Sequence, residues 1–172
     1  VISPGIEFRA GAIQGYDAAA MAAMPPAYTS GPEVLTLRRQ LEAMDDGGTV
    51  VISSPVNPAR CPPAPYEAQW MLDEYFSKKG IRDRVQIEYF TREAEPTGEA
   101  HDPVVWMDAE SKRRGIKQNY EFVVRSIDPE RKQVHGLYNY KIDYDLLVMV
   151  PPHRPAQVLL DSGLADTESG IR

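Results

Sequence analysis

The stretch "TVVISSPVNPARCPPAPYEAQW" (residues 49–70) decides the fold. It opens with a short β-branched run over 49–53, which is typical of a strand buried on both faces. After a long turn, apolar side chains recur at helical spacing in the order Ala68, Met71, Leu72, Tyr75 and Phe76. Pro65 suits the first helical position and Gly80 a helix end. We therefore predict a strand, a long turn and a helix from about Pro65 to Gly80.

Similar patterns lie on both sides of this unit. Upstream, Ser30 and Glu33 form a capping box, which predicts a helix from about Pro32 to Met44, stopped by Gly47 and Gly48. Downstream, "VQIEYF" (85–90) reads as a second strand. A further helix is bracketed by Asp102 at the N-cap, Pro103 at the first position and Gly115 past the end.

The remainder of the chain is rich in strand patterns. Three consecutive strands are predicted over 117–128, 132–140 and 140–151, with turns at "DPER" and "YNYK". The order of elements predicts the α/β class. We expect a Rossmann-like three-layer domain of the FAD/NAD(P)-binding type, with a central parallel sheet and an antiparallel β-meander inserted before the last core strand.

Composition excludes several classes of partner. The 172 residues carry a net charge of −6, so the surface as a whole does not attract nucleic acid or anionic lipid. No apolar run approaches the roughly 20 residues that a membrane span requires. The single cysteine cannot form a disulfide within the chain. The chain starts without methionine, on "VISPGIEF", and we expect it to be an excised piece of a longer protein.

The turn between the first predicted strand and helix lacks the features of a nucleotide site. A dinucleotide-binding turn uses G-x-G-x-x-G so that backbone amides can approach a pyrophosphate. Here residues 54–64 contain no glycine, and several prolines remove N–H donors that a phosphate needs. The sequence therefore predicts that NAD does not bind at this turn.

The same turn carries a thiol. Cys61 precedes the predicted helix, and the positive end of a helix dipole favours the thiolate form. Glu67 falls in the first helical turn, within reach as a base or charge partner. Two readings stay open: Cys61 and Glu67 form a catalytic pair, or Cys61 is a small buried residue and Glu67 only complements the dipole.

Other candidate residues carry weaker signals. His101, His135 and His153 have no metal-ligand spacing with each other or with Cys61, so no metal site is expected. His153 and Pro152 follow the last predicted core strand, at the edge where α/β sheets bind ligands. Trp70 and Trp106 are expected to serve packing.

Several strings resemble one protein family. "RCPPAPYE" (60–67), "GGTVVIS" (47–53), "LLVMVPPHRPA" (146–156) and "IQGYDAAAMAAMPPAYTSG" (13–31) resemble the flavoprotein subunit of flavocytochrome c sulfide dehydrogenases. That family is related to sulfide:quinone oxidoreductases. The resemblance covers nearly the whole chain and is weak over 90–140, where only the pattern of elements agrees.

The resemblance implies FAD as the cofactor of the parent protein. It implies that Cys61 forms a redox-active disulfide beside the flavin with a cysteine outside this chain, and that Glu67 handles protons there. Further residues expected near the cofactor are Ser3, Pro4, Gly5 and Pro152. The G-x-G-x-x-G that would hold FAD is missing, so the 172 residues alone are expected to be inactive.

The resemblance also implies a domain division and partners. Residues 1–46 would lead out of the FAD-binding domain, 47–151 would form a second, NAD-like domain, and 152–172 would return toward the first. Sulfide would be the substrate and a cytochrome c subunit the electron acceptor, in the periplasm. Two alternatives remain, a membrane-associated sulfide:quinone oxidoreductase and a non-catalytic interaction domain. A homodimer of the chain is also left open.

Overall fold

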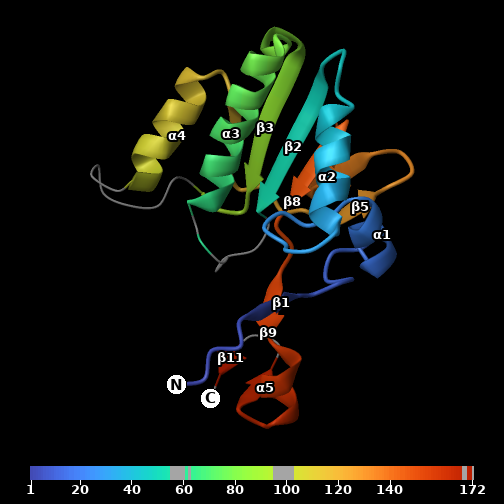
Figure 1. Ribbon diagram of the computed structural model, residues 1–172, viewed down its shortest axis with the longest axis vertical. Coiled ribbons are helices and arrows are strands. Elements are labelled where there is room, and N and C mark those ends of the chain that lie inside the picture. The colour runs from blue at the N-terminus through green and yellow to red at the C-terminus, as the bar shows by residue number, and fades with distance from the viewer. Residues whose placement is uncertain (55–60, 62, 95–102, 168–169, 172) are drawn as a thin grey trace.

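A four-stranded parallel sheet forms the centre of the computed structural model, which describes residues 1–54, 61, 63–94, 103–167 and 170–171 (Figure 1). The strands follow the order β4-β3-β2-β8, and every neighbouring pair is parallel. Their bounds are β2 Gly48–Ser54, β3 Val85–Thr91, β4 Lys117–Asn119 and β8 Leu146–Met149. The β-branched run of β2 lies at the centre, where Val50, Val51 and Ile52 are all 0% exposed.

Helices cover one face of this sheet. They are α2 (Glu33–Glu42), α3 (Ala64–Lys79) and α4 (Pro103–Arg113). Leu72 and Phe76 of α3 pack with Val50 and Ile52 of β2 in one hydrophobic cluster. Burying a large apolar side chain stabilises by about 1.5–3 kcal/mol, so these contacts fix the position of α3 on the sheet.

A β-meander and a short helix cover the other face. The meander consists of β5 (Ser126–Asp128), β6 (Gln133–His135) and β7 (Lys141–Asp143), paired antiparallel in that order. The helix α1 (Ala18–Ala23) begins at Asp17, whose carboxylate accepts from the amides of Ala19 and Ala20. The predicted three-layer α/β fold, with a meander before the last core strand, is therefore confirmed.

Segments near both chain ends form a smaller unit. β1 (Ile6–Phe8) pairs antiparallel with β9 (His153–Pro155), and α5 (Gln157–Asp161) follows. β10 (Ala165–Thr167) pairs with β11 (Gly170–Ile171). In Figure 1 this unit lies beyond the arrowheads of β2 and β3, so it faces the carboxyl edge of the parallel sheet.

The prediction of three continuous strands over 117–151 was wrong in detail. The first segment splits into β4 and β5 because Glu121 adopts a left-handed φ of 53° and turns the chain away from the sheet. The second is cut short after β6, where Tyr138 and Asn139 are also left-handed and form the turn η2 (Leu137–Asn139). The third divides at Asp145, whose carboxylate accepts from the Thr49 amide at 2.7 Å.

The observed helix boundaries agree with those predicted from the sequence, with small differences. The Ser30–Glu33 capping box was wrong, because Pro32 is the N-cap of α2 and no side chain caps that helix. Pro65 occupies the second position of α3, one residue later than predicted. Gly80 and Gly115 adopt left-handed φ angles of 75° and 70° at the ends of α3 and α4, as expected. The predicted N-cap Asp102 lies outside the described residues.

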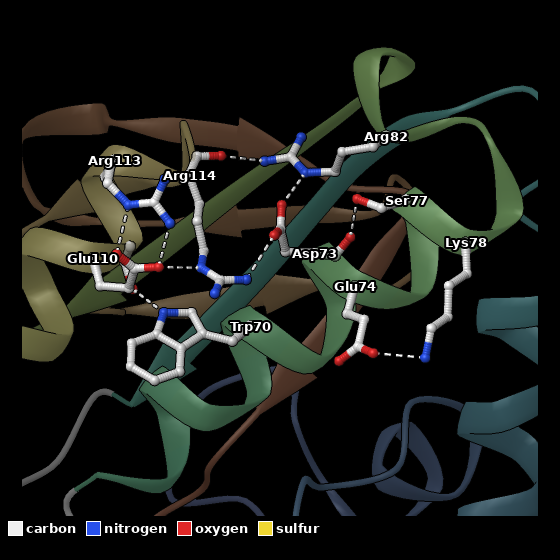
Figure 2. A network of polar contacts seen from close by, with 10 residues as sticks. Trp70, Asp73, Glu74, Ser77, Lys78, Arg82, Glu110, Arg113 and Arg114 are labelled. Carbon is white, nitrogen blue, oxygen red and sulfur yellow. Dashed lines mark hydrogen bonds and ion pairs between the residues drawn. The ribbon is translucent and has the colours of Figure 1, made fainter.

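A charged network fixes α3 to its neighbours (Figure 2). Asp73 in the middle of α3 accepts from Arg82 Nε at 2.5 Å and from Arg114 Nη1 at 3.1 Å. Arg82 belongs to the turn η1 (Arg82–Arg84), and Arg114 directly follows α4. Glu110 of α4 accepts from both Arg113 and Arg114. Since α3 is held at its middle by these contacts, the direction in which its N-terminus points is fixed as well.

A close approach of two backbones at Gly15 gives a stability prediction. A Cβ at Gly15 would lie 1.9 Å from the carbonyl oxygen of Ile127, and the φ of Gly15 is +77°. Gly115 has a similar φ of +70° but open space around it. Left-handed strain alone costs about 1–2 kcal/mol, and a backbone clash adds to it. Urea denaturation is therefore expected to show a clearly larger loss of stability for Gly15→Ala than for the matched Gly115→Ala. Equal losses would contradict the close approach.

Acid titration gives a second prediction. Hydrogen bonds from Arg113 and Arg114 lower the pKa of Glu110 from its ordinary 4.5 to about 2. The contribution of the ionised Glu110 carboxylate to the stability of the folded chain is therefore fully present above pH 4.5. It is lost as the pH falls toward 2 and the carboxylate takes up a proton. The difference in urea midpoint between the native chain and Glu110→Gln should shrink over that range. Glu74→Gln, which removes an exposed i,i+4 partner of Lys78, is the control for a single surface pair.

Candidate functional site

The strand order reverses between β2 and β8. The chain moves outward from β2 to β3 and β4 through helices, and then returns through the meander to pair β8 with the opposite edge of β2. Ligands of open α/β sheets bind outside the carboxyl ends of the strands at such a reversal. The candidate site lies at this edge.

A pocket of about 270 Å³ occupies that edge. Its lining comes from four segments that are far apart in the sequence. The residues are Phe8, Tyr28, Cys61, Ala64, Glu67 and His153. Three aromatic rings, one thiol and one carboxylate thus meet in one small space, beside the turn that the sequence singled out.

The turn after β2 places the thiol at the start of α3. Cys61 is exposed and adopts a left-handed φ of 58°, and its carbonyl accepts from the Ala64 amide at 3.0 Å. Glu67, in the first turn of α3, is exposed on the same pocket. Cys61 is therefore accessible at the sheet edge instead of being buried as a small core residue.

The N-terminus of α3 offers few backbone donors to this sulfur. Pro63 and Pro65 have no N–H. The Ala64 amide already donates to Cys61 O, and the amides of Tyr66 and Glu67 both donate to Pro63 O, at 2.9 and 3.1 Å. The positive end of a helix dipole resides mainly in free N–H groups, so the dipole contributes less here than the sequence led us to expect.

The opposite wall of the pocket comes from the β1–β9 ladder. Phe8 pairs with His153 across the ladder, and their ring centroids lie 5.4 Å apart. Arg154 Nη2 donates to Glu7 Oε2 at 2.7 Å, and the Gln157 amide donates to the other oxygen of Glu7. These contacts lower the pKa of Glu7, the bond from Gln157 being the larger cause. The ladder thus holds two rings beside the thiol.

The structure brings together only part of the predicted site. Cys61, Glu67 and His153 share the pocket. Ser3, Pro4 and Gly5 are exposed and do not line it, and Pro152 is buried, with its carbonyl accepting from the Arg9 amide. His101 lies outside the described residues.

Two lining residues were missed by the sequence analysis. Phe8 and Tyr28 reach the pocket only through the fold, because nothing in local spacing links residues 8 and 28 to residue 61. The sequence analysis includes Tyr28 only within the string over 13–31 that carries the family resemblance, and does not assign it to the site. An aromatic residue within a proline-rich loop next to a sheet edge was the available signal.

The tryptophans act in packing, as predicted. Trp70 and Trp106 meet edge to face with centroids 5.3 Å apart, and Trp70 Nε1 donates to Ser111 Oγ at 3.0 Å. Arg114 lies over the Trp70 ring at 5.5 Å. Within the ranges that the structure covers, no cluster of three or more His, Cys, Asp or Glu side chains is placed to hold a metal ion.

The parallel sheet with its meander, and a pocket at the strand reversal, define a Rossmann-like α/β domain. The chain belongs to the family described as sulfide dehydrogenase (flavocytochrome c) flavoprotein chain, central, which matches residues 34–151. The predicted relation to the flavocytochrome c and sulfide:quinone oxidoreductase group is thereby confirmed.

Individual relatives agree with this assignment. The mitochondrial sulfide:quinone oxidoreductase of Dictyostelium discoideum is 28% identical over 140 residues, which are 76% of this chain and 29% of the relative. The enzyme of the same name from Schizosaccharomyces pombe is 26% identical over 127 residues, 69% of this chain and 27% of the relative. The chain therefore spans under a third of the length of these relatives.

A solved structure shows the same fold. The sulfide:quinone oxidoreductase of Aquifex aeolicus superposes with a TM-score of 0.75 at 19% identity, over 96% of this chain and 39% of that one. Reduced CoADR-RHD of Bacillus anthracis gives a TM-score of 0.62 at 12% identity, over 95% of this chain and 27% of that one.

Membership in a flavoprotein family makes FAD the cofactor of the parent protein. The lining of the pocket fits the edge of such a cofactor, because aromatic rings can stack on a planar ring system and the thiol and carboxylate can meet its polar atoms. The chain offers no glycine turn for the phosphates. When bound, the flavin would supply a two-electron redox centre beside these side chains.

Exposure of the only cysteine gives a test of the site geometry. In the native 172-residue chain, a small maleimide should add once, at Cys61, without denaturant. Intact-mass spectrometry and peptide mapping would show one adduct. Modification that begins only after urea is added would contradict the accessible pocket.

Proposed function

We propose that the chain is the central part of an FAD-dependent sulfide dehydrogenase, with Cys61 as one half of a redox-active disulfide. The supporting observation is the position of Cys61, exposed in a pocket with Glu67 at the strand reversal of a flavoprotein domain. The names of the relatives support sulfide as the substrate.

The proposed chemistry is thiol–disulfide exchange. Hydrosulfide attacks one sulfur of the disulfide between Cys61 and a cysteine beyond these 172 residues. A new sulfur–sulfur bond forms, the old one breaks, and one cysteine leaves as a thiolate while the other carries the persulfide. A bound flavin would serve as the acceptor of the two electrons released when the thiolate sulfur and the outer persulfide sulfur join in a new S–S bond. The role of this chain is to hold Cys61 close to the start of α3 and to keep its sulfur accessible.

Glu67 is the proposed proton-handling group. Its carboxylate is exposed on the pocket wall and can accept a proton from hydrogen sulfide, which yields the hydrosulfide that attacks the disulfide. The residues proposed to lie toward the cofactor remain Ser3, Pro4, Gly5 and Pro152. Of these, Pro152 adjoins the pocket residue His153.

A cytochrome c subunit is the proposed electron acceptor, and the periplasm the proposed compartment. The match to a flavocytochrome c flavoprotein chain favours cytochrome c as the acceptor. The alternative acceptor is quinone, in a protein attached to the membrane surface, and the names of the relatives favour it. Within the described ranges, no helix has both the length and the apolar content needed to cross a bilayer.

The test uses the full-length, flavin-loaded parent protein. Sulfide should bleach the oxidised-flavin absorbance, and Cys61→Ser should slow this bleaching by a factor on the order of 10³ or more, because the exchange loses one of its two sulfurs. Ser77→Ala, an exposed change on the same helix, is the matched control and should bleach at the native rate.

Three results would count against the proposal. One is a parent protein without flavin, and another is a Cys61→Ser variant that bleaches at the native rate. The third is peptide mapping of the oxidised parent that finds Cys61 unpaired. Reoxidation of the bleached protein by cytochrome c or by a soluble quinone then distinguishes the two acceptors.

A further inference from the structure

We propose that a groove in the β-meander binds a nucleoside phosphate, with the base on aromatic rings and the phosphate on two cations. The groove lies along the turn between β6 and β7 and shares no lining residue with the pocket that contains Cys61. The proposed sulfide chemistry does not use it, so this inference is independent of the proposed function.

The groove consists of two hollows that follow the same two segments of the chain. The larger one, of about 640 Å³, is lined by residues 121–123 and 137–141. The smaller one, of about 240 Å³, is lined by residues 125–126 and 135–141. Because residues 137–141 line both, the hollows adjoin, and one extended ligand can occupy them together. The larger volume lies in the range of about 300–1,000 Å³ that is typical of small-molecule sites.

The smaller hollow is lined by two cations and by no carboxylate. Arg125 and Lys141 are both exposed there, and neither side chain has an ion pair among the described residues. Since the chain as a whole carries a net charge of −6, two unpaired cations in a lining without acids form a local site of attraction for anions. Guanidinium and ammonium groups bind phosphate oxygens through charge-assisted hydrogen bonds.

Cross-strand pairing fixes the wall of this hollow. Ser126 pairs with His135, and His135 pairs with Lys141, so the three residues lie in one row across the meander. The His135 ring is held on both sides, because Nδ1 lies 3.3 Å from Ser126 Oγ and Nε2 lies 3.2 Å from Gln133 Oε1. Asp143, further along β7, accepts from Gln133 Nε2 at 2.7 Å and does not line the hollow. The row therefore gives Lys141 a fixed base.

The larger hollow offers aromatic rings. Phe122 and Tyr140 line it and meet edge to face, with ring centroids 5.2 Å apart. Phe122 also packs on the buried ring of Phe90 at 4.7 Å. A Cβ at Gly136 would lie 2.6 Å from Phe122 Cζ, so this ring rests directly on the backbone of the turn. Rings held in this way provide a surface on which a base can stack.

Tyr138 adds a ring that has no partner. It is 98% exposed, it lines both hollows, and no ring contact involves it within the described ranges. Tyr138 and Asn139 are neighbouring left-handed residues, a conformation that persists where the surrounding structure imposes it. Two hydrogen bonds close the turn, from the Gly136 amide to Tyr140 O at 2.8 Å and from the Tyr140 amide to Leu137 O at 3.0 Å. The turn thus holds the Tyr138 ring outward where the two hollows meet.

A nucleoside phosphate matches both hollows at once. Its phosphate is negatively charged and accepts hydrogen bonds, which suits the donors of the smaller hollow. Its base is planar and has a π-face, which suits the rings of the larger hollow. Inorganic phosphate would use the smaller hollow alone, and an uncharged nucleoside the larger one alone.

The test measures the binding of AMP to the 172-residue chain by isothermal titration calorimetry, with inorganic phosphate and adenosine as partial probes. AMP should bind saturably and at least about fivefold more tightly than either probe, because base stacking and charge-assisted hydrogen bonds each contribute roughly that factor or more. Binding of AMP should weaken as salt is added, since exposed cations are screened.

Matched variants locate the site. Arg125→Gln and Lys141→Gln should each weaken AMP about threefold to tenfold and leave adenosine unchanged. Arg131→Gln removes a charge from the same meander outside both hollows and should bind AMP like the native chain. Tyr138→Ala should weaken AMP and adenosine about fivefold and leave inorganic phosphate unchanged. Circular dichroism should not change, because all four side chains are exposed.

Each outcome decides the inference. Absence of saturable AMP binding overturns it, and so does equal affinity for AMP and inorganic phosphate, which would indicate an oxyanion site without a base. Binding of native strength in either cation variant, or an equal loss in Arg131→Gln, also overturns it. If one cation variant alters the circular dichroism, the other decides. Flavin bleaching by sulfide in the parent depends on none of these results, so the proposed function and this inference can fail separately.

Discussion

Parallel pairing on both edges of β2 is the constraint on which the structure depends. β2 pairs with β3 over seven residues and with β8 over four, and its apolar side chains are completely buried. Because the three strands are parallel, their carboxyl ends open at one edge. The turn with Cys61 leaves from β2, Tyr28 is anchored beside β8, and His153 follows β8. The site therefore exists because the central strand has a partner on each side.

Much of the fold could be predicted because its core elements obey simple patterns. The β-branched run of β2 and the apolar spacing of α3 each identify the element from about a dozen neighbouring residues or fewer, without any information from the rest of the chain. The meander was harder, since its strands are three residues long and are interrupted by left-handed residues such as Glu121 and Tyr138. A tyrosine or glutamate at positive φ has no local sequence signal, because tertiary contacts impose that conformation.

The residues of the candidate site also fall into those that the sequence could predict and those that it could not. Cys61 and Glu67 could be predicted because they lie on one strand–turn–helix unit. Phe8 and Tyr28 could not, since they enter through the β1–β9 ladder and the hydrogen bond from the Ala27 amide to Met149 O, which are contacts between distant segments. Pro152 and His153 were both placed at this edge by the sequence; in the structure Pro152 is buried and His153 lines the pocket.

The prolines of the turn have two linked consequences. By removing amide donors and occupying the first turn of α3, they deny a phosphate the backbone cradle that this fold usually provides. The same prolines leave few free backbone amides at the start of α3, beside Cys61. The polar side chains that share the pocket with Cys61 are the phenol of Tyr28, the imidazole of His153 and the carboxylate of Glu67, and two of these three come from other segments of the chain. The network around Asp73 keeps α3, and with it Glu67, in place at this pocket.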